Sequence, residues 1–228
     1  MSSQQYSELS IVSCTTCSSK RSPPTKNDMK NNLALLLYTS LLFIGYCLSG
    51  CGLQNQPELP ILGTINSPYT FTNQKGESVS QATFAGKVYV ADFFFTSCPT
   101  ICPIMKTQMA RIYKALKNED RFLLLSHTID PEHDTVEVLK DYSDRLNVSA
   151  ERWHMVTGKK SEIYDNAMHY MLAAAEDEKA PGGFIHSGSF CLVDHQSRIR
   201  GFYRGTEKEA VDRLIKDIHR LLGEVAPK

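Results

Sequence analysis

Two cysteines, Cys98 and Cys102, stand four positions apart in residues 93–105 (FFFTSCPTICPIM), and a proline follows each of them. At helical spacing their Cα atoms would lie roughly 6 Å apart, within the range that a disulfide bridges. Two thiols this close can exchange disulfides with another protein, or hold a soft metal ion such as Cu(I). The remaining alternative is an inert structural disulfide.

The elements around the cysteines favour reactive thiols. Residues 87–95 (KVYVADFFF) read as a strand that is buried on both faces, and a helix is predicted over 103–117. The N-terminus of a helix carries about half a positive charge, which stabilises a thiolate over a thiol. Because proline is tolerated in the first turn of a helix, we expect the regular helix to begin at Pro103. Residues 98–102 are then expected to form an irregular cap that turns both sulfurs outward.

Strands and helices alternate through the rest of the chain. The predicted elements are a hairpin over 69–80 turning at Lys75-Gly76, a strand over 121–129, a helix over 135–147 capped by Asp134 and Glu137, a strand over 153–156, a helix over 160–174, a hairpin of 187–194 with 198–203, and a last helix capped by Thr206 and Glu209. This order predicts an α/β fold: a thioredoxin-like sandwich whose central mixed sheet is flanked by helices, with an N-terminal β-hairpin.

The N-terminal part reads as an export signal. Residues 33–48 are uncharged and largely apolar, too short to span a membrane comfortably, and lysines precede them. Leu48-Ser49-Gly50-Cys51 resembles the lipobox of bacterial lipoproteins, in which the cysteine is lipidated. We interpret 1–28 as a disordered or mis-assigned extension, 29–50 as a lipoprotein-type signal peptide, 51–64 as lipidated Cys51 with a tether, and 65–228 as the domain. An uncleaved anchor helix is the alternative.

Either interpretation places the domain outside the cytoplasm, in an oxidising compartment of a bacterial cell envelope, attached to a membrane. Lys and Arg together number 25, as do Asp and Glu, and no basic stripe is present. Nucleic acid is therefore not expected as a partner.

Three blocks of the sequence resemble the signature blocks of the Sco/SenC family: FFFTSCPTICPIM, TIDPEHDT (128–135) and FIHSGSFCLVD (184–194). The resemblance covers residues 65–222. It implies a thioredoxin fold, one copper held by Cys98, Cys102 and His186, and delivery of that copper to the copper-accepting subunit of a respiratory cytochrome oxidase. Two positions depart from the family pattern, because Thr100 replaces a frequent acidic residue and His133 a frequent arginine.

Two histidines are candidates for the third ligand. His186 follows Gly182-Gly183 and precedes a strand, where thioredoxins keep a cis-proline loop facing their cysteines, and a set of two sulfurs and one nitrogen suits Cu(I) and Cu(II). His127 is the alternative, since it ends the second parallel strand at the same edge of the sheet. The other histidines in the domain, His154, His169, His195 and His219, are assigned to packing or the surface.

Asp92 lies six residues before Cys98 in a strand that is otherwise apolar. A buried carboxylate there would have a raised pKa and could take a proton from the second cysteine; alternatively it hydrogen-bonds a neighbour. Cys191 reads as a buried free thiol. Asp130 and Asp134 read as turn and cap residues, with a contact to His186 as the alternative.

The sequence thus favours a membrane-anchored copper chaperone for oxidase assembly, served by a possible thiol reductase. The alternative is a thiol–disulfide oxidoreductase that acts on the oxidase cysteines or on other exported proteins, with Cys98 and Cys102 as the redox pair. Copper enters only when both are reduced, so the two functions are compatible. A thiol peroxidase is the third possibility, although it would not require the paired prolines or the facing histidine.

Overall fold

The computed structural model describes residues 57–225; residues 1–56 and 226–228 lie outside the described part. Its centre is an eight-stranded sheet with the order β1-β10-β9-β4-β5-β6-β2-β3. The inner strands β4 (Val88–Phe94), β5 (Phe122–Thr128) and β6 (Trp153–Thr157) run parallel, and the strands outside them pair antiparallel. The predicted α/β fold with a central mixed sheet is confirmed.

The two innermost strands, β4 and β5, are buried along their whole length. They pair in register, with Asp92 opposite Ser126 and Phe93 opposite His127. Because side chains alternate along a strand, Asp92 and Ser126 face one side of the sheet, whereas Phe93 and His127 face the other. Each face therefore buries its own small set of polar groups among apolar residues.

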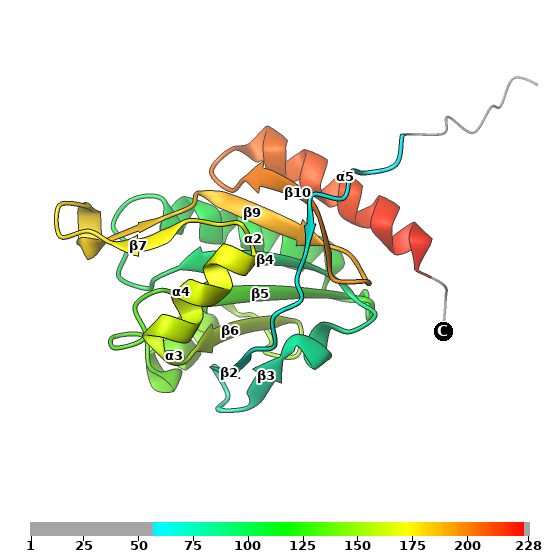
Figure 1. Ribbon diagram of the computed structural model, residues 1–228. Helices are drawn as coiled ribbons and strands as arrows, with labels where there is room; N and C mark the ends of the chain where they lie inside the picture. The colour runs from blue at the N-terminus through cyan, green and yellow to red at the C-terminus, as the bar shows by residue number, and fades with distance from the viewer. Residues whose placement is uncertain (1–56, 226–228) are drawn as a thin grey trace, which may run out of the picture. The chain divides into compact units, whose positions relative to one another are not determined.

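In the described part of the chain, four helices cover the sheet, and the two faces differ (Figure 1). α2 (Cys102–Leu116) and α3 (Val136–Leu146) cover the face of Asp92, where Phe94 contacts Lys106 of α2 and Tyr142 of α3. α5 (Lys208–Glu224) packs beside α2 on that face and is joined to it by the Arg111–Asp212 ion pair. α4 (Lys160–His169) covers the face of His127, to which it contributes Asn166.

The predicted hairpins are present. β2 (Thr70–Asn73) pairs with β3 (Ser78–Ser80), after which a short 3-10 helix, η1 (Gln81–Phe84), leads to β4. β9 (Ser189–Val193) pairs with β10 (Arg198–Arg204). Asp194 closes that turn, because its carboxylate accepts hydrogen bonds from the backbone amides of Gln196 and Arg198.

The segment between α4 and β9 differs from the prediction. A helix was expected over 160–174, but α4 ends at His169, Tyr170 is fully buried, and Met171 has a left-handed backbone (φ 56°). The chain then forms a separate two-stranded hairpin of β7 (Ala174–Glu176) and β8 (Phe184–His186), joined through the 3-10 turn η2 (Pro181–Gly183). Burial of the Tyr170 ring, not helical periodicity, decides where α4 stops.

Two predicted helix caps are wrong. Thr135, not Asp134, caps α3 by accepting a hydrogen bond from the backbone amide of Val138, and the Glu137 side chain bonds to Thr135. α5 begins at Lys208, with Glu207 at the N-cap position and no side-chain hydrogen bond to the helix end, so Thr206 is not the N-cap residue. In α2, Met105 is buried and Ile104 is exposed.

The compact unit begins at Pro57. Residues 57–64 lie against it: β1 (Gly63–Thr64) pairs with β10, and the buried Arg200 donates a hydrogen bond of 2.6 Å to the Leu59 carbonyl. The predicted extension, signal peptide and lipidated Cys51 lie outside the described residues. Within residues 57–225, no helix combines the length and the apolar character needed to cross a membrane.

Candidate metal centre

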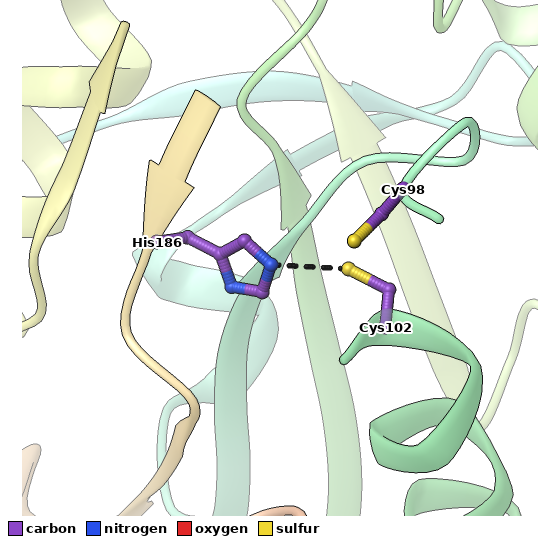
Figure 2. Close-up of side chains that lie close together, drawn as sticks. All are labelled: Cys98, Cys102 and His186. Atoms are coloured by element: carbon purple, nitrogen blue, oxygen red, sulfur yellow. Dashed lines mark hydrogen bonds between the residues drawn. The ribbon is translucent and has the colours of Figure 1, made fainter. Parts of the chain in front are cut away.

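Cys98, Cys102 and His186 come together at one point of the structure (Figure 2). Their two sulfurs and one ring nitrogen all lie within 4.8 Å of one another. The Sγ atom of Cys102 lies 3.1 Å from Nε2 of His186, a residue 84 positions away in the chain. Of the two histidines considered from the sequence, His186 is the one that reaches the cysteines.

The cysteines are positioned by the end of β4 and the beginning of α2. A tight turn follows the strand, in which the Cys98 amide donates to the Phe95 carbonyl, and α2 begins at Cys102 with Pro103 in its first turn. The start of the helix agrees with the prediction to one residue, but the expected outward orientation of the sulfurs is wrong. Cys98 is 7% exposed and Cys102 is 2% exposed, and His186 of β8 lies against the Cys102 sulfur.

The two thiols differ in their electrostatic surroundings. Burial raises the pKa of Cys98, but hydrogen bonds from the Thr100 and Cys102 amides and the Thr100 hydroxyl outweigh it, so the net shift is downward. Burial raises the pKa of Cys102 to about 12. Cys98 is therefore the sulfur that ionises more readily, and Cys102 becomes a thiolate only when a bound cation or disulfide chemistry displaces its proton.

His186 is the last residue of β8 and points its ring at Cys102 (Figure 2). Its Nδ1 donates to the Ser187 carbonyl at 3.2 Å, which leaves the Nε2 lone pair facing the Cys102 sulfur. Burial is the largest influence on its pKa and lowers it. A neutral imidazole with a free Nε2 lone pair is the form that binds a metal ion.

A buried carboxylate holds the loop that leads to Cys98. Asp134 accepts hydrogen bonds from the Thr96 amide (3.0 Å), from the Thr96 hydroxyl, and from Thr128 at the end of β5. It also contacts the exposed His133, whose pKa it raises. No hydrogen bond joins Asp130 or Asp134 to His186 in residues 57–225. Asp134 thus does not cap α3 as predicted, and instead its carboxylate links the loop before Cys98 to the end of β5.

Asp92, on the strand that leads to Cys98, is part of a buried ion pair. Its carboxylate accepts from Lys106 Nζ at 2.8 Å and from the Ser126 hydroxyl, and both charged side chains are almost fully buried. Among the described residues, no hydrogen bond joins Asp92 to either cysteine. The structure thus shows the alternative weighed from the sequence, a hydrogen bond to a neighbour, while transfer of a proton to or from Cys102 stays a prediction.

Lys106 is a residue that the sequence reasoning missed. It is four positions after Cys102 and three before Met109, so it lies on the buried side of α2. A lysine on the apolar side of a predicted helix was the feature of the sequence that could have indicated a buried charge. Cys191 is a buried free thiol in β9, as expected, and burial raises its pKa.

The remaining histidines lie away from the sulfurs. His127 is fully buried on the other face of the sheet, where its ring stacks on Phe93 and its Nε2 accepts a hydrogen bond from the Asn166 amide at 3.0 Å. His169 and His219 are exposed, His195 is half-buried in the β9–β10 turn, and His154 is buried in β6.

The donor set fits one metal ion. With bonds of about 2.0–2.3 Å, three donors around one ion would lie roughly 3.5–4 Å apart. The three ligand atoms here already lie within 4.8 Å of one another, so small side-chain rotations are sufficient. The fold and site thus define a thioredoxin-like protein with a metal centre of two cysteines and one histidine.

Comparison with known proteins identifies the family. The family model described as SCO1/SenC matches residues 61–223. The SCO1 protein homolog of Bacillus subtilis is 34% identical over 184 residues, which cover 80% of this chain and 93% of the relative. The chain belongs to the SCO1/SenC family, and the predicted resemblance is confirmed.

Solved structures agree in fold. A SCO1/SenC family lipoprotein from Bacillus anthracis is 30% identical, with a TM-score of 0.65, covering 71% of this chain and 97% of that one. BsSco is a member of the Sco family of cytochrome c oxidase assembly proteins in which a disulfide switch was identified. It is 32% identical, with a TM-score of 0.63, and the match covers 73% of this chain and 98% of BsSco. Bradyrhizobium japonicum ScoI with copper bound shares the fold at 22% identity, with a TM-score of 0.58 and coverage of 68% and 98%.

Proposed function

We propose that this protein is a copper chaperone that carries one copper ion between Cys98, Cys102 and His186 and hands it to the copper centre of a respiratory cytochrome oxidase. The observation that carries the proposal is the meeting of two sulfurs and one free imidazole nitrogen within 4.8 Å. Membership of the SCO1/SenC family, in which a relative has been solved with copper bound, supports the choice of metal.

The chemistry of the donors also favours copper. Two soft thiolates select Cu(I) or Zn²⁺ over hard cations, and adding one imidazole suits copper in both oxidation states. Zinc in proteins takes four ligands, or three and a water. A buried set of three donors, without a fourth in residues 57–225, favours the lower coordination number that Cu(I) accepts.

A second function, thiol–disulfide exchange, is favoured by the asymmetry of the thiols. The pKa of Cys98 is lowered while that of Cys102 is raised, as suits an attacking and a resolving cysteine. A pair oxidised to a disulfide cannot hold copper, so the same two sulfurs would switch loading on and off. The disulfide switch named for BsSco supports this second function.

Attachment to a membrane through Cys51, on the extracytoplasmic side of a bacterial cell envelope, completes the proposal. It is supported by the apolar run 33–48 followed by Leu48-Ser49-Gly50-Cys51 and by the lipoprotein among the solved relatives. A Cys51→Ala variant should no longer incorporate labelled fatty acid and should leave the membrane fraction. If wild type and variant incorporate label equally, lipidation at Cys51 is wrong.

Copper titration tests the main proposal. Reduced protein, kept anaerobic, should take up one Cu(I) per chain from a chromophoric chelator. Cys98→Ala and Cys102→Ala should abolish that uptake, and His186→Ala should weaken it by at least about tenfold, which is what loss of even an outer-sphere partner costs. His169→Ala, an exposed histidine of α4, is the control and should bind as wild type does.

Two results would overturn the assignment. Unchanged copper affinity in His186→Ala, with a loss in His127→Phe, would make His127 the ligand. Absence of stoichiometric copper, together with undiminished disulfide exchange in His186→Ala, would leave the oxidoreductase. Deletion of the gene should lower oxidase activity in cells, and Cys102→Ala should fail to restore it.

A further inference from the structure

The Lys106–Asp92 pair lies on the two elements that lead to the cysteines of the metal centre and is not part of its donor set. Lys106 is one helical turn beyond Cys102 on α2, and Asp92 is on β4, the strand that leads to Cys98. Both side chains are almost fully withdrawn from solvent, at 2% and 0% exposure. A buried ion pair is costly to form and contributes little net stability, so its position beside the sulfurs calls for an explanation.

All polar atoms of the pair have partners. Lys106 donates to Asp92 at 2.8 Å and to the Ser126 hydroxyl at 3.1 Å, and its ammonium lies 3.8 Å from the centre of the Phe94 ring. Ser126 in turn donates to Asp92 and accepts from the Trp153 indole at 2.9 Å. This network holds the ammonium in one place, whereas the ammonium of a flexible surface lysine would have no fixed position.

The two charges of the pair are placed differently with respect to Cys102. Lys106 is on the same helix as Cys102, one turn further along and on the same buried side. Asp92 is on β4, six residues before Cys98, and no hydrogen bond among the described residues joins it to either cysteine. The positive end of the pair is therefore the one that shares the helix and the buried side of the Cys102 sulfur.

The charge of the loaded site depends on the copper oxidation state. Two thiolates and one neutral imidazole give a net charge of −1 around Cu(I) and zero around Cu(II). A fixed positive charge in a poorly solvated region stabilises the more negative state.

We propose that Lys106 is a positioning residue whose buried ammonium, held by Asp92 and Ser126, biases the centre toward carrying copper as Cu(I). This inference rests on the proposed copper function and adds the oxidation state of the cargo. It also implies that the reduced pair is favoured over the disulfide, because a reduced cysteine can ionise to a negative thiolate whereas a disulfide carries no charge.

The experiment compares Lys106→Met with Asp92→Asn. The Cu(II)/Cu(I) midpoint potential of the loaded full-length protein is measured by spectroelectrochemistry. Lys106→Met should disfavour Cu(I) about tenfold, a fall of about 59 mV for a one-electron couple. Asp92→Asn leaves the ammonium uncompensated and should shift the potential upward. Lys114→Met removes an exposed lysine from the same helix and should leave the potential unchanged.

A metal-free measurement supplies a second readout. In glutathione buffers two glutathione molecules are oxidised as the Cys98–Cys102 disulfide takes up two electrons and two protons. Lys106→Met should shift this equilibrium toward the disulfide, and Asp92→Asn toward the dithiol.

A purely structural pair would destabilise both variants and shift both potentials the same way or not at all, which would overturn the inference. If a single variant does not fold, Lys106→Met/Asp92→Asn removes both charges together, and its potential should still lie below wild type. An unchanged potential in that variant would equally overturn the proposal. Failure of the wild-type protein to bind copper would instead refute the proposed function, leaving the glutathione equilibrium to decide on Lys106.

Discussion

His127 and His186 are two histidines in different regions of the molecule, and burial lowers the pKa of each. His127 lies in the middle of the sheet, on the face covered by α4, where its Nε2 lone pair is taken by Asn166. His186 lies at the end of the β8 hairpin, half-buried, with its Nε2 lone pair directed at a sulfur.

The difference shows that a lowered pKa alone does not make a histidine a ligand. Burial lowers the pKa of both imidazoles, but a neighbour in the protein already occupies the donor atom of His127. The sheet uses His127 as an aromatic packing residue, whereas the hairpin presents His186 to a cation. The two regions should therefore respond to mutation in opposite ways.

The largest expected effect sharpens that contrast. His127→Ala removes a fully buried ring that stacks on Phe93 at 4.6 Å, and should lower the free energy of unfolding by about 3–4 kcal/mol. His186→Ala should cost less than about 1 kcal/mol, because that ring is half-buried on a separate hairpin. Urea unfolding measures both. Equal losses in the two variants would contradict the division of roles.

The free energy of unfolding should depend on pH through the protonation of His127. Burial lowers its pKa to about 4, against about 6.5 in an unfolded chain. The unfolded state therefore binds the proton more readily between these values. The contribution of neutral His127 to the free energy of unfolding, about 3 kcal/mol, is complete above pH 6.5 and is lost as the pH falls through 4.

The variant His127→Phe isolates this part of the pH dependence, since phenylalanine keeps the stacking and cannot titrate. Its unfolding free energy should fall less steeply between pH 6.5 and 4 than that of the wild type. His169→Ala should retain the wild-type slope. A His127→Phe slope identical to wild type would assign the acid sensitivity to the carboxylates.

A smaller effect is expected from Asn166, the partner of His127. Asn166→Ala leaves the buried Nε2 without its donor and should cost about 1–3 kcal/mol. Asp165→Ala, an exposed neighbour on α4, is the matched control and should stay within about 0.5 kcal/mol of the wild type. Copper affinity should be unchanged in both variants, because neither residue touches the centre; a change there would connect the two regions.

The smallest effect concerns the hairpin that carries His186. Gly182 and Gly183 both have positive φ, 81° and 84°, so alanine strains each by about 1–2 kcal/mol. A Cβ at Gly182 would also lie 2.8 Å from the Phe95 ring and 3.3 Å from Pro99, next to Cys98, whereas at Gly183 it meets nothing within 4 Å. Gly182→Ala should therefore weaken Cu(I) binding several-fold more than Gly183→Ala. Equal affinities would show that Phe95 adjusts freely.

Much of the fold was predictable from local pattern. The buried strands β4 and β5 were placed to within a residue, because continuous apolar runs bounded by polar turns have few other readings. The cysteine pair at the strand–helix junction followed from the same runs together with Pro103. The caps were predicted less well, because Asp134 is drawn into the loop before Cys98, a contact that adjacent sequence does not reveal.

The site divides in the same way. Spacing along the chain determined that Cys98 and Cys102 lie close together where β4 ends and α2 begins, since only three residues separate them at that junction. His186 could be singled out only through a family resemblance and a presumed facing loop. The β7–β8 hairpin that actually delivers it has no strong period of its own.

By itself, the sequence determined the two buried central strands, the class of fold and the two sulfurs. Tertiary structure alone decided that the sulfurs are enclosed, that Nε2 of His186 faces Cys102, and that Lys106 is paired with Asp92. The physical reason is range: hydrogen-bonded periodicity acts over a few residues, whereas these contacts join groups 14 to 84 positions apart, whose meeting depends on how the whole sheet packs.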